Sequence, residues 1–294
     1  MLTRRQFAQG ATAISLLALA RGAEAATQAL AAEADLASQF AKIEKKIGGR
    51  LGVAVSGDGL KAAYHGGERF PMCSTFKLLV VAAVLHRVDE GDEMLSREIP
   101  VPPDAILDYA PVAKEYAGGT MTISELCEAA MVWSDNTAAN LILERLGGPE
   151  AATAYVRSLG DTVTRIDRME PDANVFGPGE LRDTTTPEAM LGDLQKLFLG
   201  DALSPLSRDR LTEWFVANQT GKDRLRAGLP PTWRVGDRTG TGPHGTSNDV
   251  AMAWGEDGRP ILIAAFLTGS KADAAARDNA LADVGRAIGA AAAG

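Results

Sequence analysis

The chain has few of the side chains that metal and redox chemistry need. Its 294 residues include three histidines and two cysteines. The histidines, His65, His86 and His244, show neither metal-ligand spacing nor a rhythm of Asp or Glu around them. Cys73 and Cys127 could form one bridge, but no sequence feature brings them together, so we expect free thiols. The composition argues against a metal-dependent hydrolase, and we expect neither a metal nor a cofactor.

An excess of positive charge and long apolar runs are also missing. The net charge is −8, which argues against a nucleic-acid partner, because phosphate backbones bind basic surfaces. Beyond the N-terminal region, no segment has the roughly 18 consecutive apolar residues of a membrane span. With 46% hydrophobic and 23% charged residues, the composition is that of a globular protein with a sizeable core. We expect a monomer without nucleic-acid or membrane partners.

The first 25 residues have the features of an export signal. Arg4, Arg5 and Phe7 precede a moderately apolar stretch over 11–20, and small residues around Glu24 suit a signal peptidase. The twin arginines are typical of Tat signals, and the alternative is a Sec signal that happens to carry two arginines. We therefore expect an exported protein, periplasmic or secreted, in which residues 26–294 form a single domain.

The two ends of this domain carry the strand patterns. Five segments alternate apolar and polar residues or are bounded by turns as strands are: 51–56, 61–65, 234–239, 250–255 and 260–268. Helical patterns flank them over 27–47 and 272–293. The middle lacks strand patterns and has helical ones over 75–89, 122–132, 135–146, 149–159 and 187–199.

This distribution predicts an α+β fold with two lobes. A five-stranded antiparallel sheet from both termini, flanked by helices, would form one lobe from 26–69 and 216–294, and 70–215 would form an all-helical lobe. A cleft between the lobes is the expected place for a site. The stretch over 164–183 is too long and too rich in Pro and Gly for a connector, and we expect a packed Ω-loop there.

Ser74 and Lys77 stand at the start of an apolar run over 78–85. Residues three apart share one face of a helix, so a hydroxyl and an amine would meet in apolar surroundings. Burial lowers the pKa of an ammonium, which would make Lys77 a proton acceptor for a nucleophilic Ser74. Most Ser and Lys pairs at this spacing are only a helix cap and a solvated side chain, so the interpretation depends on other residues.

Three further groups follow along the chain. Ser134, Asp135 and Asn136 lie at a break between two predicted helices, Glu170 lies in the long loop, and Arg-Thr-Gly-Thr over 238–241 lies on a predicted strand. Taken singly, the segment from Ser134 to Asn136 is compatible with an N-cap, and the segment over 238–241 is compatible with a strand that ends in a turn. Together, in this order and spacing, they resemble the class A serine β-lactamases over essentially the whole mature chain.

The resemblance implies a two-step acyl transfer that opens and hydrolyses the β-lactam ring of penicillins and some cephalosporins, and so confers resistance. Ser74 would be the nucleophile, and the backbone N–H groups of Ser74 and Thr241 would bind the oxyanion. Lys77, or Glu170 through a water, would take the serine proton. Ser134 would pass a proton to the departing ring nitrogen. The implied substrate-binding residues are Asn136, Asn174, Arg238, Thr239, Gly240, Thr241, Arg224 and Tyr109.

In the same resemblance Glu170 and Asn174 would hold the water that releases the acyl group. The two residues that usually close this loop with an ion pair correspond to Arg168 and Asp183. D,D-peptidases share the serine, lysine and basic-Thr-Gly plan but lack such a loop. A β-lactam sensor that acylates and stops needs a membrane-anchored partner domain. The loop therefore favours a hydrolase over a peptidase, and a signal that looks cleavable argues against a sensor.

The sequence departs from the family pattern at Arg238, where lysine is usual. Arginine keeps the charge and offers a fork of donors, but it cannot relay a proton as lysine can. Members with arginine here hydrolyse carbenicillin, so we hypothesise a penicillinase that accepts carboxypenicillins. Ser247 replaces a second family arginine, and we assign its charge to Arg224. Some relatives that hydrolyse carbapenems have a disulfide between a cysteine at the position of Cys73 and a second cysteine on the strand after the third motif. This chain has Gly242 at the second position, which disfavours a carbapenemase of that bridged type.

Overall fold

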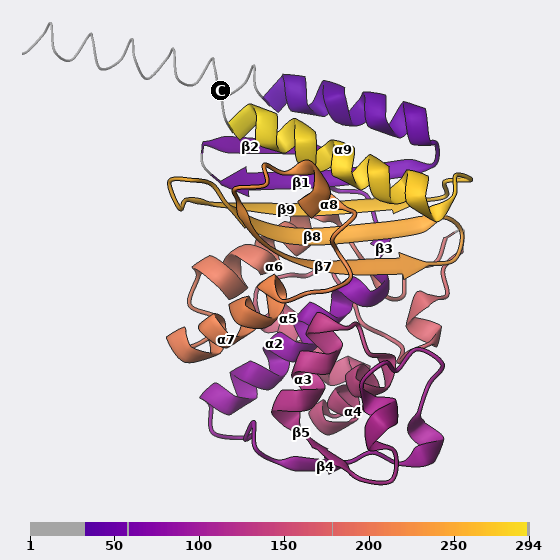
Figure 1. Ribbon diagram of the computed structural model, residues 1–294, viewed down its shortest axis with the longest axis vertical. Helices are drawn as coiled ribbons and strands as arrows, with labels where there is room; N and C mark the ends of the chain where they lie inside the picture. The colour runs from indigo at the N-terminus through magenta and orange to yellow at the C-terminus, as the bar shows by residue number, and fades with distance from the viewer. Residues whose placement is uncertain (1–32, 58, 178, 293–294) are drawn as a thin grey trace, which may run out of the picture.

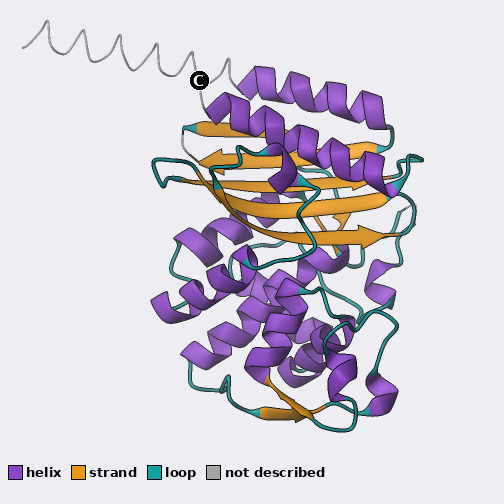
Figure 2. Ribbon diagram, viewed as in Figure 1, coloured by secondary structure: helices purple, strands orange, loops and turns teal. Residues whose placement is uncertain are grey.

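The computed structural model describes residues 33–57, 59–177 and 179–292. The export signal predicted over 1–25 lies outside these residues. A five-stranded antiparallel sheet in the order β2–β1–β9–β8–β7 has helices on both of its faces (Figures 1 and 2). Within the described ranges, no helix combines the length and the apolarity that crossing a membrane requires.

Both ends of the chain build this sheet. Its strands are β1 (Arg50–Gly57), β2 (Leu60–Tyr64), β7 (Arg234–Gly242), β8 (Thr246–Trp254) and β9 (Pro260–Thr268). Val53 of β1 lies opposite Tyr64 on one side and Ala265 on the other, so the first strand pairs with the last. This arrangement confirms the predicted fold class.

The second layer consists of the helices between β2 and β7. They are α2 (Phe76–Asp89), α3 (Ile123–Val132), α4 (Asn136–Leu146), α5 (Pro149–Ser158), α6 (Pro187–Leu194) and α7 (Pro205–Val216). The short α8 (Leu225–Gly228) is an exception, because it packs against α9 (Ala274–Ala292) on the other face of the sheet. Short 3-10 turns accompany them, among them η1 (Cys73–Thr75). The helix predicted over 187–199 ends at Leu194 and continues as a π-helix over Gln195–Leu199.

Helix α7 and two short strand pairs were not predicted from the sequence. α7 begins at Pro205 after Ser204, whose hydroxyl accepts from Ser207 N at 3.2 Å, a combination typical of a helix start. Two short strand pairs also occur, β3 (Phe70–Pro71) with β6 (Thr184–Thr185) and β4 (Glu98–Pro100) with β5 (Thr120–Thr122). Strands of two or three residues are too short for an alternating pattern to show.

Two apolar cores lie on opposite faces of the sheet. Successive strand residues point to opposite sides, so Leu262 and Phe266 face the helical layer whereas Ile261 and Ile263 face the terminal helices. α2 runs through the first core, and its residues from 76 to 85 are all buried. A polar side chain on this helix must find its partners inside the protein, because unpaired polar groups are costly to bury.

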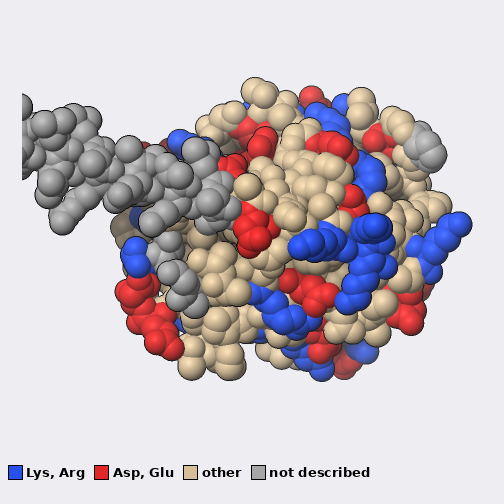
Figure 3. All heavy atoms as spheres, turned by 90° about the horizontal axis from the view of Figure 1, so that it is seen from above, with Lys and Arg blue, Asp and Glu red and all other residues tan. Residues whose placement is uncertain are grey.

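The outer face is formed by the helix over 33–47 and by α9 (Ala274–Ala292) (Figure 1). Seen from above, its acidic and basic side chains are interspersed (Figure 3). Asp283, for example, accepts from Lys46 at 3.3 Å and also pairs with Arg286. Mixed charge of this kind differs from the continuous basic stripe typical of nucleic-acid binding.

Candidate active site

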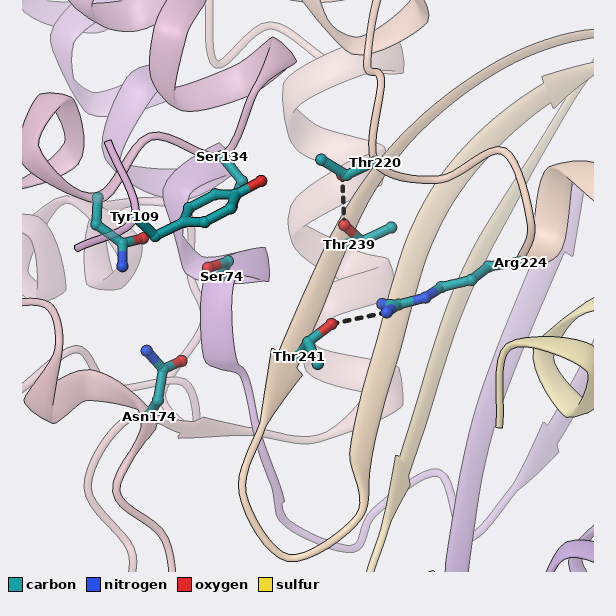
Figure 4. Close-up of a pocket in the computed structure, with 9 residues that line it drawn as sticks. Ser74, Tyr109, Ser134, Asn174, Thr220, Arg224, Thr239 and Thr241 are labelled. Carbon is teal, nitrogen blue, oxygen red and sulfur yellow. Dashed lines mark hydrogen bonds between the residues drawn. The ribbon is translucent and has the colours of Figure 1, made fainter. Parts of the chain in front are cut away.

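A pocket of about 350 Å³ opens between β7 and the helical layer (Figure 4). Its lining residues are Ser74, Tyr109, Ser134, Asn136, Asn174, Thr220, Arg224, Thr239 and Thr241. All of these except Thr220 were selected from the sequence. Four other selected residues, Lys77, Glu170, Arg238 and Gly240, lie behind the pocket wall, where they can act on the lining side chains.

Ser74 sits in η1, the turn that leads into α2. The preceding residue, Cys73, has φ +45°, a left-handed conformation that non-glycine residues seldom adopt outside functional turns. Asn248 of β8 supports this turn, since its Nδ2 donates to Pro71 O at 2.8 Å and to Met72 O at 3.0 Å. The sheet therefore holds the serine turn in place, and the Ser74 hydroxyl donates to Glu170 Oε1 at 3.3 Å.

Lys77 is completely buried one turn into the apolar helix. Its Nζ donates to Ser134 O at 2.8 Å and to Asn136 Oδ1 at 2.5 Å, and it lies 3.1 Å from Glu170 Oε1. Burial lowers the pKa of Lys77 to about 8, although the Glu170 carboxylate opposes this shift. Three acceptors match the three hydrogens of an ammonium, so the site holds Lys77 as a charged donor at neutral pH.

The Ser134, Asp135 and Asn136 motif joins two helices and a loop. Asp135 caps α4, because its Oδ1 accepts from Ala138 N at 2.9 Å. Ser134 has φ +62°, which turns its side chain toward the pocket. Asn136 N donates to Tyr109 O at 3.0 Å and so links α4 to the segment that carries this ring. Tyr109 is 51% exposed at the pocket mouth.

The loop around Glu170 is packed, as predicted. The Asn140 side chain holds the Glu170 backbone through two hydrogen bonds: its Nδ2 donates to Glu170 O at 2.8 Å, and its Oδ1 accepts from Glu170 N at 2.9 Å. Arg168 Nε donates to Asp183 Oδ2 at 2.5 Å, which confirms the predicted ion pair. Asn174 Nδ2 donates to Glu170 Oε2, so both carboxylate oxygens are engaged. Asn140 lies four residues after Asn136 on α4, a spacing that puts both on one helix face.

Arg238 lies on β7 and is completely buried. Its Nη2 donates to Ser134 Oγ at 2.7 Å and its Nη1 to Thr239 O at 2.9 Å. Burial lowers the pKa of Arg238 to about 10, and the Glu170 and Asp237 carboxylates oppose this shift. The guanidinium therefore remains charged at neutral pH and reaches the pocket through Ser134 rather than by lining it.

Gly240 allows β7 to approach the serine turn. A Cβ at this position would lie 2.5 Å from Met72 O, closer than side chains come to backbone, and a tight 3.2 Å from Ser74 N. The close approach puts Thr241, the next residue on the strand, beside Ser74 at the pocket. Gly240 thus shapes the site through its missing side chain.

Arg224 is held by a network on the sheet side of the pocket. Its Nε donates to Asp278 Oδ1 at 2.8 Å, and its Nη1 donates to Gly240 O at 2.9 Å and Asn248 O at 2.8 Å. Its Nη2 donates to Thr241 Oγ1 at 2.7 Å (dashed line in Figure 4). A guanidinium has five N–H groups, so one is left over by these contacts. Asp278 carries no signal of this role in the sequence, because it lies on α9, 54 residues after Arg224.

The two cysteines are free and buried, which confirms the expectation of free thiols. Burial raises the pKa of Cys73 to about 12, so its thiol stays protonated beside the nucleophile. A Cβ at Gly242 would lie 2.6 Å from Cys73 Sγ, which puts the two positions face to face. Among the described residues, no group of His, Cys, Asp and Glu is arranged to hold a metal ion.

Comparisons with known proteins agree with this geometry. The family model described as "Beta-lactamase enzyme family" matches residues 35–292. β-Lactamase L2 of Stenotrophomonas maltophilia is 42% identical over 97% of this chain and 98% of its own length. A β-lactamase of Mycobacterium tuberculosis is 47% identical over 90% of this chain and 88% of its own.

Solved structures give the same result. An ancestral class A β-lactamase superposes with a TM-score of 0.85 at 58% identity, covering 86% of this chain and 98% of that one. A β-lactamase from Xanthomonas campestris has a TM-score of 0.86 at 46% identity, covering 87% and 97%. With these matches over nearly all of the described residues, the chain belongs to the class A β-lactamases, enzymes that hydrolyse β-lactams and confer resistance to them.

Proposed function

We propose that this β-lactamase acts through an acyl-enzyme on Ser74 and that penicillins and some cephalosporins are its substrates. The observation that carries the proposal is the meeting of three groups in one wall of the pocket. Glu170 Oε1 lies 3.3 Å from Ser74 Oγ and 3.1 Å from Lys77 Nζ. A hydroxyl, a carboxylate and a buried ammonium at these distances are suited to moving a proton off the nucleophile.

Glu170 is the better acylation base of the two candidates. The Ser74 hydroxyl already donates to Glu170 Oε1, whereas the hydrogens of Lys77 are committed to Ser134 O, Asn136 Oδ1 and the same carboxylate. Lys77 would then stabilise the negative charge that develops as Ser74 attacks. Backbone N–H groups of Ser74 and Thr241 would bind the carbonyl oxygen, typically worth about 3 to 4 kcal/mol per donor.

Ring opening needs a proton for the leaving nitrogen, and Ser134 is placed to supply it. Its oxygen accepts from Arg238 Nη2 at 2.7 Å, which leaves its own hydrogen free to face the pocket. The proton that Glu170 took from Ser74 must then pass to Ser134, which restores the Ser134 hydroxyl and the Glu170 carboxylate. For deacylation, this carboxylate would deprotonate a water that Asn174 helps to hold, since Asn174 Nδ2 already contacts Glu170 Oε2.

The substrate carboxylate would be bound on the β7 side. Arg224 has an N–H to offer beside the Thr241 hydroxyl, which accepts from Arg224 and can therefore donate outward. Arg238 adds charge from behind Ser134. Two fixed arginines on this side favour substrates with additional negative charge, which supports the carboxypenicillin hypothesis. Asn136 and Tyr109 would contact the acylamino side chain.

We also propose that residues 1–25 export the protein, by the Tat route, to the periplasm or the medium, where residues 26–294 act as a single monomeric domain. The support is the twin-arginine sequence followed by an apolar stretch and a small-residue cleavage site. Fusing residues 1–30 to a reporter that fluoresces only after folding in the cytoplasm would test the route.

The mechanism is tested by Glu170→Ala in purified residues 26–294. The unchanged chain should hydrolyse nitrocefin and benzylpenicillin with steady turnover. The variant should form an acyl-enzyme more slowly than the unchanged chain, because its acylation base is gone, and should then retain it, seen as the mass of one added benzylpenicillin. Glu150→Ala on the exposed start of α5 should behave like the unchanged chain. Full turnover by Glu170→Ala would remove Glu170 from deacylation. A stoichiometric burst without turnover in the unchanged chain would indicate a β-lactam sensor.

A further inference from the structure

Thr220 is the pocket residue that no sequence motif marks. It lies in the segment between α7 and α8, and its Oγ1 is 2.5 Å from Thr239 Oγ1 (Figure 4). Its backbone N and its hydroxyl also contact Asn218 Oδ1, at 3.1 Å and 2.8 Å. Thr220 therefore connects the pocket wall to a buried amide, and the direction of these hydrogen bonds decides what Thr239 can offer a substrate.

The orientation of Asn218 sets this direction. A Cβ on Gly221 would collide with Asp237 Oδ2 and lie 3.1 Å from Asn218 Nδ2, so these two atoms meet over the space that the glycine leaves. The Asp237 carboxylate, which pairs with Arg226, thus lies on the side of the Asn218 amide nitrogen. The Thr220 backbone N–H can only donate, so the Asn218 atom that faces it at 3.1 Å is the amide oxygen, which can only accept.

The hydroxyl hydrogens of the unliganded site follow from this. Thr220 gives its hydrogen to Asn218 Oδ1, so the 2.5 Å contact with Thr239 needs the Thr239 hydrogen. Thr239 then points its hydrogen away from the pocket and presents only lone pairs there. Lone pairs repel a carboxylate, although Thr239 lies on the side where the two arginines favour one.

We propose that Thr220 is a positioning residue for the substrate carboxylate, whose entry reverses this hydroxyl chain. Thr239 turns its hydrogen to the carboxylate, Thr220 turns its own from Asn218 to Thr239, and Asn218 Oδ1 keeps the Thr220 N–H at 3.1 Å. The number of hydrogen bonds is conserved and no proton leaves its oxygen. A hydroxyl that receives a hydrogen bond also donates more strongly, so Thr220 strengthens the Thr239 contact with the substrate.

This inference rests on the proposed function and deepens it, and its test is a comparison of two substrates. Thr220→Val removes the hydroxyl and keeps the shape. KM for benzylpenicillin should rise about fivefold with kcat unchanged, because in the complex the Thr239 oxygen would no longer receive the Thr220 hydrogen, an effect the size of one net hydrogen bond. For benzylpenicillin methyl ester, which lacks the carboxylate, kcat/KM should not change. Thr220→Ser should restore KM for the acid.

Thr212→Val is the matched control, because Thr212 is also partly buried and its hydroxyl donates to Arg208 O at 2.8 Å within α7, away from the pocket. It should leave KM for both substrates unchanged. Thermal unfolding of each variant separates loss of fold from loss of binding. An unchanged KM for the acid in Thr220→Val, or equal losses for acid and ester, would overturn the assignment of Thr220.

Failure of the proposed function looks different. If the unchanged chain forms an acyl-enzyme without turnover, hydrolysis is refuted. The role of Thr220 can then still be tested by measuring the acylation rate of each Thr220 variant as a function of substrate concentration. If Thr220→Val needs a higher concentration than the unchanged chain to reach half of its maximal acylation rate with the acid but not with the ester, the role of Thr220 is supported. Identical curves for the two proteins contradict it.

Discussion

The buried Arg238 guanidinium donates a hydrogen bond of 2.7 Å to the hydroxyl of Ser134, which lies 104 residues earlier in the chain. Because this cation is completely buried, its field reaches the pocket with little screening by salt or solvent. It stays protonated at neutral pH, so it orients Ser134 without exchanging a proton with it. Part of the positive charge at the site is thus carried by a buried residue that does not line the pocket.

Replacing Arg238 by Lys should therefore reduce turnover unequally. Lysine keeps the charge but loses the fork that joins Ser134 Oγ and Thr239 O. We expect a loss of about tenfold in kcat/KM for carbenicillin, the size of one charge-assisted hydrogen bond, and a smaller loss for benzylpenicillin. Arg234→Lys, on the exposed start of the same strand, is the control. Equal losses on both penicillins would refute the carboxypenicillin hypothesis.

The pH profile should distinguish the two candidate bases. The pKa of Lys77 is lowered to about 8 by burial, so the ammonium is present below this pH and is lost above it. If Glu170 is the base and the ammonium stabilises the developing charge, kcat/KM for benzylpenicillin should fall above about pH 8. If neutral Lys77 is the base, kcat/KM should rise through the same range. Melting temperatures at each pH exclude unfolding as the cause.

Asp193 should make the protein less stable as pH rises. Burial and the neighbouring Asp161 carboxylate raise the pKa of Asp193 to about 9, well above the value in an unfolded chain. The native state then keeps a proton that the unfolded state loses, so between about pH 4 and 9 stability falls by up to about 1.4 kcal/mol per pH unit. Asp193→Asn should flatten this decline in urea unfolding, whereas exposed Asp209→Asn should not. Parallel declines for all three proteins would contradict the shift.

A cysteine at position 242 should form a disulfide with Cys73. The Cβ of such a residue would lie 2.6 Å from Cys73 Sγ, so only a small adjustment is needed. On oxidation Gly242→Cys should lose the mass of two hydrogens and two of its three thiols, and it should gain roughly 2 to 4 kcal/mol of stability. Gly242→Ser keeps the added volume without the bond. Three free thiols in Gly242→Cys after oxidation would show that the strand and the serine turn are too far apart for the bond.

Much of the fold could be predicted because its elements are long and their patterns regular. The alternation over 260–268 and the helical spacing over 75–89 each persist through a whole element. α7 was missed because its apolar residues form no clear stripe, although Ser204 and Pro205 mark its start. The pairs β3 with β6 and β4 with β5 depend on partners distant in sequence, and a strand of two or three residues has no local pattern that indicates its partner.

The sequence by itself determined the parts of the site that short-range geometry sets. Ser74 and Lys77 lie one helical turn apart, and Asp135 caps the helix that follows it, because these relations involve residues within four positions of one another. The resemblance to the family then supplied Glu170 and the strand over 238–241. These inferences needed no knowledge of how the elements pack.

Only the tertiary structure decided which atoms meet across the pocket. The contact of Thr220 with Thr239 and the ion pair of Arg224 with Asp278 join elements through the packing of α8 and α9 against the sheet. The burial of Arg238 behind Ser134 has the same origin. A hydrogen bond depends on tenths of an ångström and on the direction of one hydrogen, and for residues far apart in sequence these are set by strand register and core packing, not by any local pattern.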